Sequence, residues 1–203
     1  MSYVGAGRLN QPLEVLELRE TATGVWEWVT LRRAWAQVEQ TAKTNLFSKV
    51  GVGARDAAIV IRQQTLTLHQ ALRWKGQHLF LTSIIKRDRM HLDLQAALVT
   101  VIRCKAIRYT TTVGAGNRPE KTEQPPVTFP GVLTEKYVRY EVEDTYAKAR
   151  RGLVLVTPKP IVLHEGDLVT VMEGPAAAVY NVRALHVLDE FKNEYEMDFS
   201  RDV

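Results

Sequence analysis

The side chains that could do chemistry are scattered along this sequence, and few stand at spacings that a reaction needs. Two histidines four residues apart on a helix, or histidines beside cysteines, would indicate a metal site. No two histidines have that spacing, and the single cysteine, Cys104, accompanies none of them. The histidines are His69, His78, His91, His164 and His186. We expect His69 and His164 to be polar residues at strand ends rather than metal ligands.

Motifs for covalent catalysis and for nucleotide binding do not appear either. An activated serine in a Gly-x-Ser-x-Gly turn is absent from the sequence. Three Gly-x-Gly pairs lack the third glycine of a dinucleotide loop and the Gly-Lys-Ser/Thr of a phosphate loop. These pairs begin at Gly5, Gly51 and Gly114. We predict that the chain is not an enzyme and uses no cofactor or metal. A carboxylate pair of the glycosidase type is the alternative that the sequence leaves open.

Charge and cysteine content restrict the partners and the compartment. The 203 residues carry a net charge of +4 at a pI of about 9.2, without the dense basic run of a dedicated double-helix binder. Cys104 cannot form an internal disulfide, which is typical of a reducing cytoplasm. No run of 18 apolar residues and no signal peptide is present. We therefore expect the protein to be made in the cytoplasm and not to associate with a membrane.

The elements that must position these side chains are mainly strands. Short alternating or continuously apolar runs recur, separated by polar or glycine-containing turns. They lie at residues 13–18, 34–39, 58–61, 66–68, 79–85 and 90–94. Helical signals are few. The sequence therefore predicts a mostly-β protein made of two tandem small β-barrel or sandwich modules with little helix.

An internal repeat supports two modules. Residues 59–69 match residues 154–164 with an offset of 95, and each segment ends in a histidine. Residues 79–84 match 180–185, residues 90–94 match 195–199, and residues 34–39 match 138–143. These offsets imply that the first copy carries nine extra residues between Gln40 and Ala57. The alternative is that amphipathic strands simply look alike.

A proline- and glycine-rich stretch separates the copies. Residues 113–131 contain four prolines and three glycines, a composition that disfavours a central strand or helix. We predict a module at 8–104, a connection at 105–126 and a second, related module at 127–203.

The four tryptophans all lie in the first copy, at Trp26, Trp28, Trp35 and Trp74. Aromatic residues of a strand-rich protein usually fill the core or a subunit interface. Their alternative role, interleaved with arginines, is to stack on bases of single-stranded nucleic acid.

The order of motifs around Trp35 resembles the head-completion proteins of tailed bacteriophages, also called stoppers or connectors. The features are the run Trp35-Ala36-Gln37-Val38-Glu39, the loop from Gln40 to Ala57, and Trp74-Lys75-Gly76-Gln77-His78-Leu79. The resemblance covers roughly residues 8–100. It departs from the family in length and in the second copy, which lacks the tryptophan motif; a tandem of two modules is the natural explanation.

This resemblance implies a virion protein of the phage neck. It implies a homo-oligomeric ring between a portal or adaptor and the tail terminator or tail tube, around packaged double-stranded DNA. We expect the loop from Gln40 to Ala57 to face the channel or a neighbouring ring. Its candidate contact residues are Lys43, Asn45, Phe47, Lys49, Gly51, Gly53 and Arg55. Two alternatives stay open: a tail-side ring protein such as a terminator, and a small-barrel module that binds nucleic acid.

Overall fold

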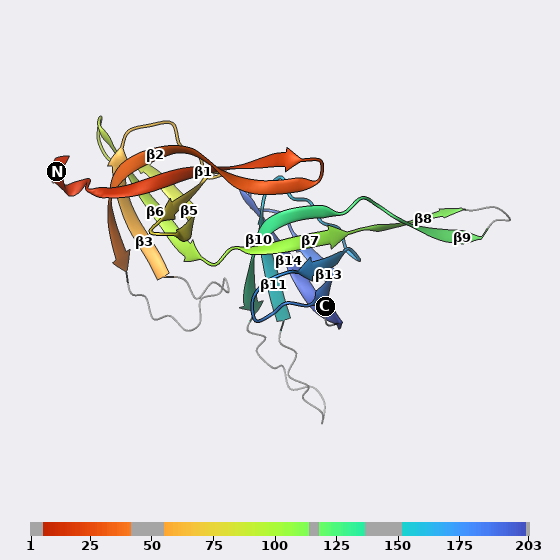
Figure 1. Ribbon diagram of the computed structural model, residues 1–203. Helices are drawn as coiled ribbons and strands as arrows, with labels where there is room; N and C mark the ends of the chain where they lie inside the picture. Colours follow the sequence, from red (N-terminus) through yellow and green to blue (C-terminus); the bar gives the residue numbers. More distant parts are fainter. Residues whose placement is uncertain (1–5, 42–54, 114–117, 137–151, 202–203) are drawn as a thin grey trace, which may run out of the picture. The chain divides into compact units, whose positions relative to one another are not determined.

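Strands make up almost the whole protein. The computed structural model describes residues 6–41, 55–113, 118–136 and 152–201. Of the chain, 69% is strand and 1% helix, which confirms the prediction of a mostly-β protein. The chain divides into two compact units: unit 1 comprises residues 1–19 and 28–100, and unit 2 comprises residues 20–27 and 101–203 (Figure 1).

Unit 1 is a cycle of six paired strands. In order along the sheet they are β1-β4-β5-β6-β3-β2, and β2 also pairs with β1, so the cycle closes. Closure leaves the cycle without a free edge strand. Its elements are η1 (Ala6–Arg8), β1 (Gln11–Ala22), β2 (Val25–Thr41), β3 (Arg55–Arg62), β4 (Ala71–Trp74), β5 (Gln77–Lys86) and β6 (His91–Val99). The tips of β1 and β2, residues 20–27, belong to unit 2.

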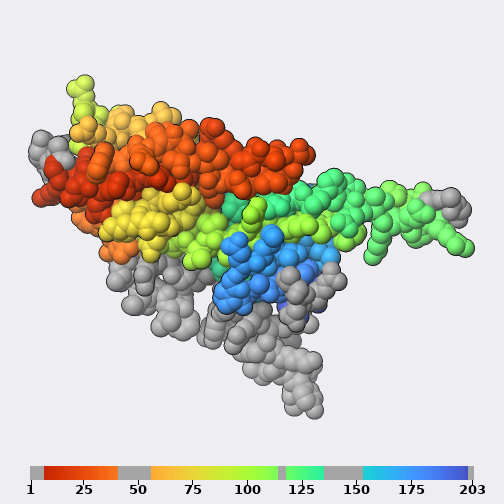
Figure 2. Space-filling model, viewed as in Figure 1, coloured from red at the N-terminus to blue at the C-terminus, as the bar shows by residue number. Residues whose placement is uncertain are grey.

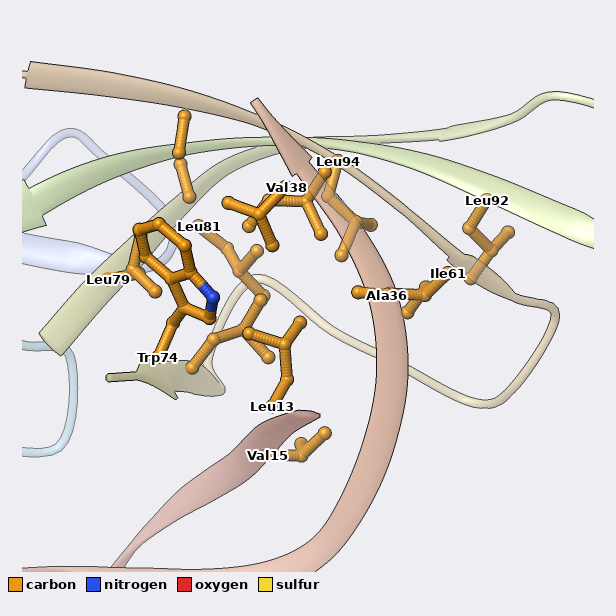
Figure 3. Packing of buried hydrophobic residues seen from close by; sticks show 14 residues of the cluster. Leu13, Val15, Ala36, Val38, Ile61, Trp74, Leu79, Leu81, Leu92 and Leu94 are labelled. Atoms are coloured by element: carbon orange, nitrogen blue, oxygen red, sulfur yellow. The ribbon is translucent and has the colours of Figure 1, made fainter. Parts of the chain in front are cut away.

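The core of unit 1 follows from alternation along each strand. Successive side chains of a strand point to opposite faces, so every second apolar residue reaches the same interior. Leu79 and Leu81 of β5 are buried there with Leu92 and Leu94 of β6. The other members of the buried cluster are Leu13, Val15, Ala36, Val38, Ala57, Ile59, Ile61, Leu72, Trp74 and Ala96 (Figure 3).

Unit 2 repeats the same cycle. Its strands follow the order β10-β11-β14-β13-β12-β7, and β7 pairs with β10 to close it. A separate two-stranded ribbon, β8–β9, completes the unit. The strands are β7 (Ile102–Ile107), β8 (Tyr109–Val113), β9 (Pro119–Glu123), β10 (Val127–Lys136), β11 (Gly152–Pro158), β12 (Leu168–Val171), β13 (Val179–His186) and β14 (Lys192–Arg201).

The two cycles agree in register as well as in strand order. β5 has a bulge between Leu81 and Ser83, and β13 has one between Val182 and Ala184, 101 positions later. Ile84 and Leu185 follow these bulges at the same distance and pair with Leu94 of β6 and Tyr195 of β14. Leu94 is therefore the counterpart of Tyr195. A shared bulge at one register position is a feature of one architecture used twice, because bulges are specific local features of a sheet.

The register corrects three details of the expected repeat. The counterpart of Ile59 is Leu155 rather than Val154, because Ile59 pairs with Leu94 and Leu155 pairs with Tyr195, the counterpart of Leu94. The counterpart of residues 34–39 lies in β10, whereas residues 138–143 fall outside the described residues. The sequence separation between β2 and β3 is 13 residues and that between β10 and β11 is 15 residues, so the expected nine-residue excess in the first copy is wrong.

The expected connection at 105–126 is also corrected, because regular structure fills most of it. β7 and β8 are separated only by Arg108, and the Gln124 N–H donates to the Arg108 carbonyl at 2.8 Å. The ladder therefore runs from β7–β10 into β8–β9 as one long hairpin. Pro130 is tolerated inside β10 because pairing with β11 begins only at Val132, so its missing N–H removes no bond on that edge.

Candidate interaction surfaces

The tip of the first hairpin is seated on β10 within unit 2. Val25 pairs with Thr128 in parallel, and the Thr128 N–H donates to the Gly24 carbonyl at 2.7 Å. Gly24 has φ +72°, and a Cβ on it would meet the Pro126 carbonyl oxygen at 2.9 Å. Only glycine combines this conformation with this approach. Residues 20–27 thus add to the β10 edge by backbone hydrogen bonds and close packing.

Trp26 of this tip lines a hollow of about 340 Å³ in unit 2. Ile161 and Leu163 form part of its apolar wall, and Arg108 and Asp167 supply its charges. Glu27, next to Trp26, lies 3.9 Å from the guanidinium of Arg103. The tip therefore contributes an aromatic side chain and an exposed ion pair to the same surface.

Arg108 and Asp167 form the most strongly bonded charged pair in the described part of unit 2. Arg108 donates from Nε to Asp167 Oδ1 at 2.9 Å and from Nη2 to Oδ2 at 2.8 Å, and Asp167 is only 3% exposed. The Asp167 Oδ2 also accepts the His164 N–H, and the same guanidinium contacts the His164 ring. The carboxylate raises the pKa of Arg108 above its ordinary value. This geometry fixes a turn rather than preparing a proton transfer.

The equivalent turn of unit 1 has the same hydrogen bonds without the charge. Gln70 occupies the place of Asp167, and its Oε1 accepts the Thr67 N–H at 3.2 Å. In both turns the fourth residue also donates its N–H to the carbonyl of the first. The structural counterpart of His164 is therefore Thr67 and not His69. The sequence could not show the Arg108–Asp167 pair, whose members are 59 positions apart.

A buried polar group holds the loop before this turn. The Tyr195 hydroxyl donates to the Ile161 carbonyl at 3.0 Å and accepts the Leu163 N–H at 3.1 Å. Asn193 donates to the Ile161 carbonyl at 2.9 Å and to the Lys159 carbonyl at 3.1 Å. Burial raises the pKa of the Tyr195 phenol, which stays protonated and able to donate.

The aromatic cluster of unit 1 surrounds an uncharged histidine. The His78 ring lies 5.1 Å from Trp28 and 5.3 Å from Phe80, centroid to centroid. Burial, with a smaller contribution from the nearby Arg73 charge, lowers the pKa of His78 to about 4. His78 and Phe80 lie on the face of β5 opposite Leu79 and Leu81, so this cluster covers the outside of the cycle.

A second hollow, of about 480 Å³, lies in unit 1 beside the edge of β2. Trp35 lines it and is 61% exposed, and Arg33 and Arg62 supply positive charge. The remaining lining residues are Leu9, Ala34, Gln63 and Gln64. This is the surface of unit 1 that combines an exposed tryptophan with two arginines.

The predicted site residues lie in different parts of the structure. Of the four tryptophans, Trp74 is a core residue, Trp28 belongs to the aromatic cluster, and Trp26 and Trp35 line the two hollows. Of the predicted contact loop from Gln40 to Ala57, residues 42–54 lie outside the described residues, and both ends are strand, where Gln40 of β2 pairs with Ala57 of β3. Arg55 begins β3, where its backbone pairs with Leu98.

Cys104 is a core residue, and burial raises the pKa of its thiol to about 12. Over the described ranges, no group of three His, Cys, Asp or Glu side chains is arranged to hold a metal ion. In the same ranges, no helix has the length and apolarity needed to cross a membrane.

Comparison with known proteins gives no further assignment. No protein-family model, no curated protein and no solved structure matches this chain.

Proposed function

We propose that this chain is a structural protein of the neck of a tailed bacteriophage, where it forms a ring between the portal or adaptor and the tail. The ring completes the head and connects it to the tail around the packaged DNA. The observation that carries the proposal is where the family-like residues lie. Trp35–Glu39 falls in β2, and Trp74–Leu79 spans the β4–β5 turn, so both belong to one closed strand cycle.

The kinds of polar contact in the described residues agree with a scaffolding role. Arg108 and Asp167 fix a turn, and Tyr195 and Asn193 fix the loop before it. A ring protein needs rigid loops and complementary edges. A mild positive charge suits a channel through which DNA passes, because strong attraction to the phosphates would impede its movement. A tail-side ring, such as a terminator, uses the same properties and is the nearest alternative.

The test is a null mutant of the gene in the phage that encodes it, examined by electron microscopy and complemented from a plasmid. A neck protein predicts separate tails and heads that are tailless or have lost their DNA. A terminator predicts tails of abnormal length. Normal infectious particles without this protein would contradict both roles.

One surface favours a second function. Trp35 beside Arg33 and Arg62 has the aromatic–arginine combination that binds single-stranded nucleic acid. If that is its role, oligonucleotide affinity should fall steeply with salt and about tenfold in Trp35→Ala, because loss of one stacked base costs on the order of 1–3 kcal/mol. Conserved affinity in that variant would exclude stacking on Trp35.

A further inference from the structure

The β8–β9 ribbon of unit 2 is the counterpart of a hairpin tip that is bound on a strand edge. The first step is the equivalence of the two hairpins. β1–β2 and the continuous pair β7/β8–β9/β10 occupy the same place in their cycles. The end of β8–β9 is therefore the counterpart of the hairpin tip at residues 20–27, which is bound on β10.

The ribbon itself is exposed. Every described residue of β9 is exposed, and Val113 at the end of β8 is 74% exposed. In Figure 2 the ribbon, drawn in green, is not covered by side chains of other described strands on the face shown. An isolated two-stranded hairpin is only marginally stable in water, so a long regular ribbon gains most from a partner.

The receiving edge has a counterpart as well. In unit 2, the tip pairs with Thr128, on the part of β10 that precedes its pairing with β11. The register makes Arg33 of β2 the counterpart of Thr128. Pairing of β2 with β3 begins at Ala36. On the edge of β2 that faces β3, residues 31–35 therefore have no strand partner among the described residues. The 480 Å³ hollow lies beside this stretch.

We propose that the β8–β9 ribbon of one copy of this chain docks on the β2 edge of unit 1 in a second copy, near Arg33. The seating repeats the one that residues 20–27 make on β10. Backbone pairing contributes most of the contact, because β9 holds Lys121 between Glu120 and Glu123, and Arg33 already lies 3.9 Å from Glu14. Arg62 of the hollow is the basic residue that Glu120 can meet. Because ribbon and edge are different surfaces, the contact is head-to-tail and closes into a ring if the rotation between copies allows it.

This contact rests on the proposed ring and specifies how its subunits join. The first experiment measures oligomer mass against concentration for the full chain and for a variant in which an Asn-Gly turn replaces residues 109–123. Circular dichroism checks that the variant is folded. We expect the concentration for half-assembly to rise at least about tenfold, a loss of roughly 1.4 kcal/mol per contact.

The second experiment locates the contact. Glu120→Cys protein is mixed with Arg33→Cys protein and treated with a short bismaleimide, so that only an adduct between copies can join the two positions. The matched control replaces Glu120→Cys with Glu173→Cys, another exposed acidic position of unit 2. Cys104 is buried and stays in all variants. We expect a two-chain adduct in the first mixture at least about tenfold above the control.

The outcomes separate this contact from the neck role. Unchanged assembly of the folded, ribbon-shortened variant would overturn the contact, while the null-mutant phenotype would still decide the neck role. A wild-type protein that stays monomeric and gives no adduct would overturn it too. Salt-sensitive oligonucleotide binding lost in Arg33→Glu, without an adduct, would assign the hollow to nucleic acid instead.

Discussion

Units 1 and 2 share strand order, register and a bulge, yet their interiors differ in chemistry. Where β3 and β6 place Ile61, Leu92 and Leu94 in the core, the matching positions of β11 and β14 hold Thr157, Asn193 and Tyr195. The three polar residues of unit 2 are almost fully buried. They all bond the loop that contains Ile161.

This difference shows that the strand cycle does not require an apolar residue at each inward position. A buried polar group costs stability unless it is bonded, and unit 2 bonds its group to backbone that would otherwise lack partners. Unit 1 instead fills the space with aliphatic side chains on which Leu66 and Leu68 pack, while Arg32 and Gln70, which are not members of this core, bond its loop. The same strand cycle thus supports a loop bonded by buried core side chains or a loop packed on them.

The largest effect should come from the charged turn of unit 2. Asp167→Ala removes the carboxylate that accepts from Arg108 and from the His164 N–H, and we expect unit 2 to lose about 2–4 kcal/mol of unfolding free energy, because the Arg108 side chain is 38% exposed and water can hydrate its charge. Gln70→Ala, the matched change in unit 1, should cost less than about 1 kcal/mol. Hydrogen exchange resolved by unit measures both. Equal losses would show that the charge adds nothing to the shared turn.

The aromatic cluster of unit 1 predicts a pH dependence of stability that originates at His78. The folded pKa of His78, about 4, is below its unfolded value of 6.5. Above pH 6.5 both states are neutral; between pH 6.5 and 4 only the unfolded state binds the proton. Unit 1 should therefore lose stability as pH falls, by roughly 3 kcal/mol at pH 4.

His78→Phe is the control for this titration, and its counterpart in unit 2 is Val179. The variant should remove most of the slope in unit 1 between pH 6.5 and 4 and leave unit 2 unchanged. Urea unfolding followed by tryptophan fluorescence, to which Trp28 beside His78 contributes, measures it. A slope that persists in the variant would assign the dependence to other groups.

Much of this fold was predictable from sequence, and the errors have physical causes. Strand alternation and the existence of a repeat were visible. The match of Ile59 in the first copy to Val154 in the second was one residue off. β11 is apolar on both faces, so the alternation of apolar and polar residues does not define which residue faces the core. The β8–β9 ribbon was taken for a connection because of the prolines and glycines of residues 113–131. The polar contacts of unit 2 join distant positions and leave no local pattern.

A smaller effect tests how closely unit 2 is packed. The Gly131 position corresponds to Ala36 in unit 1, where the side chain is buried without conflict. In unit 2 an added Cβ would meet Leu155 Cδ1 at 2.7 Å. Gly131→Ala should cost about 1–3 kcal/mol, and Leu155→Val in the same chain should recover part of it. No loss in the thermal unfolding of Gly131→Ala would mean that Leu155 moves freely.

The smallest effect addresses the polar core directly. Tyr195→Phe keeps the ring but removes the hydroxyl, so the Leu163 N–H loses its acceptor while the Ile161 carbonyl still accepts from Asn193. We expect a loss of about 1–2 kcal/mol and faster amide exchange confined to residues 159–164. The converse change, Leu94→Tyr in unit 1, places a hydroxyl where the neighbouring core is apolar, and should also destabilise. If Tyr195→Phe instead left exchange in this loop unchanged, packing would hold the loop in both units, and the contrast between their cores would have no consequence for loop stability.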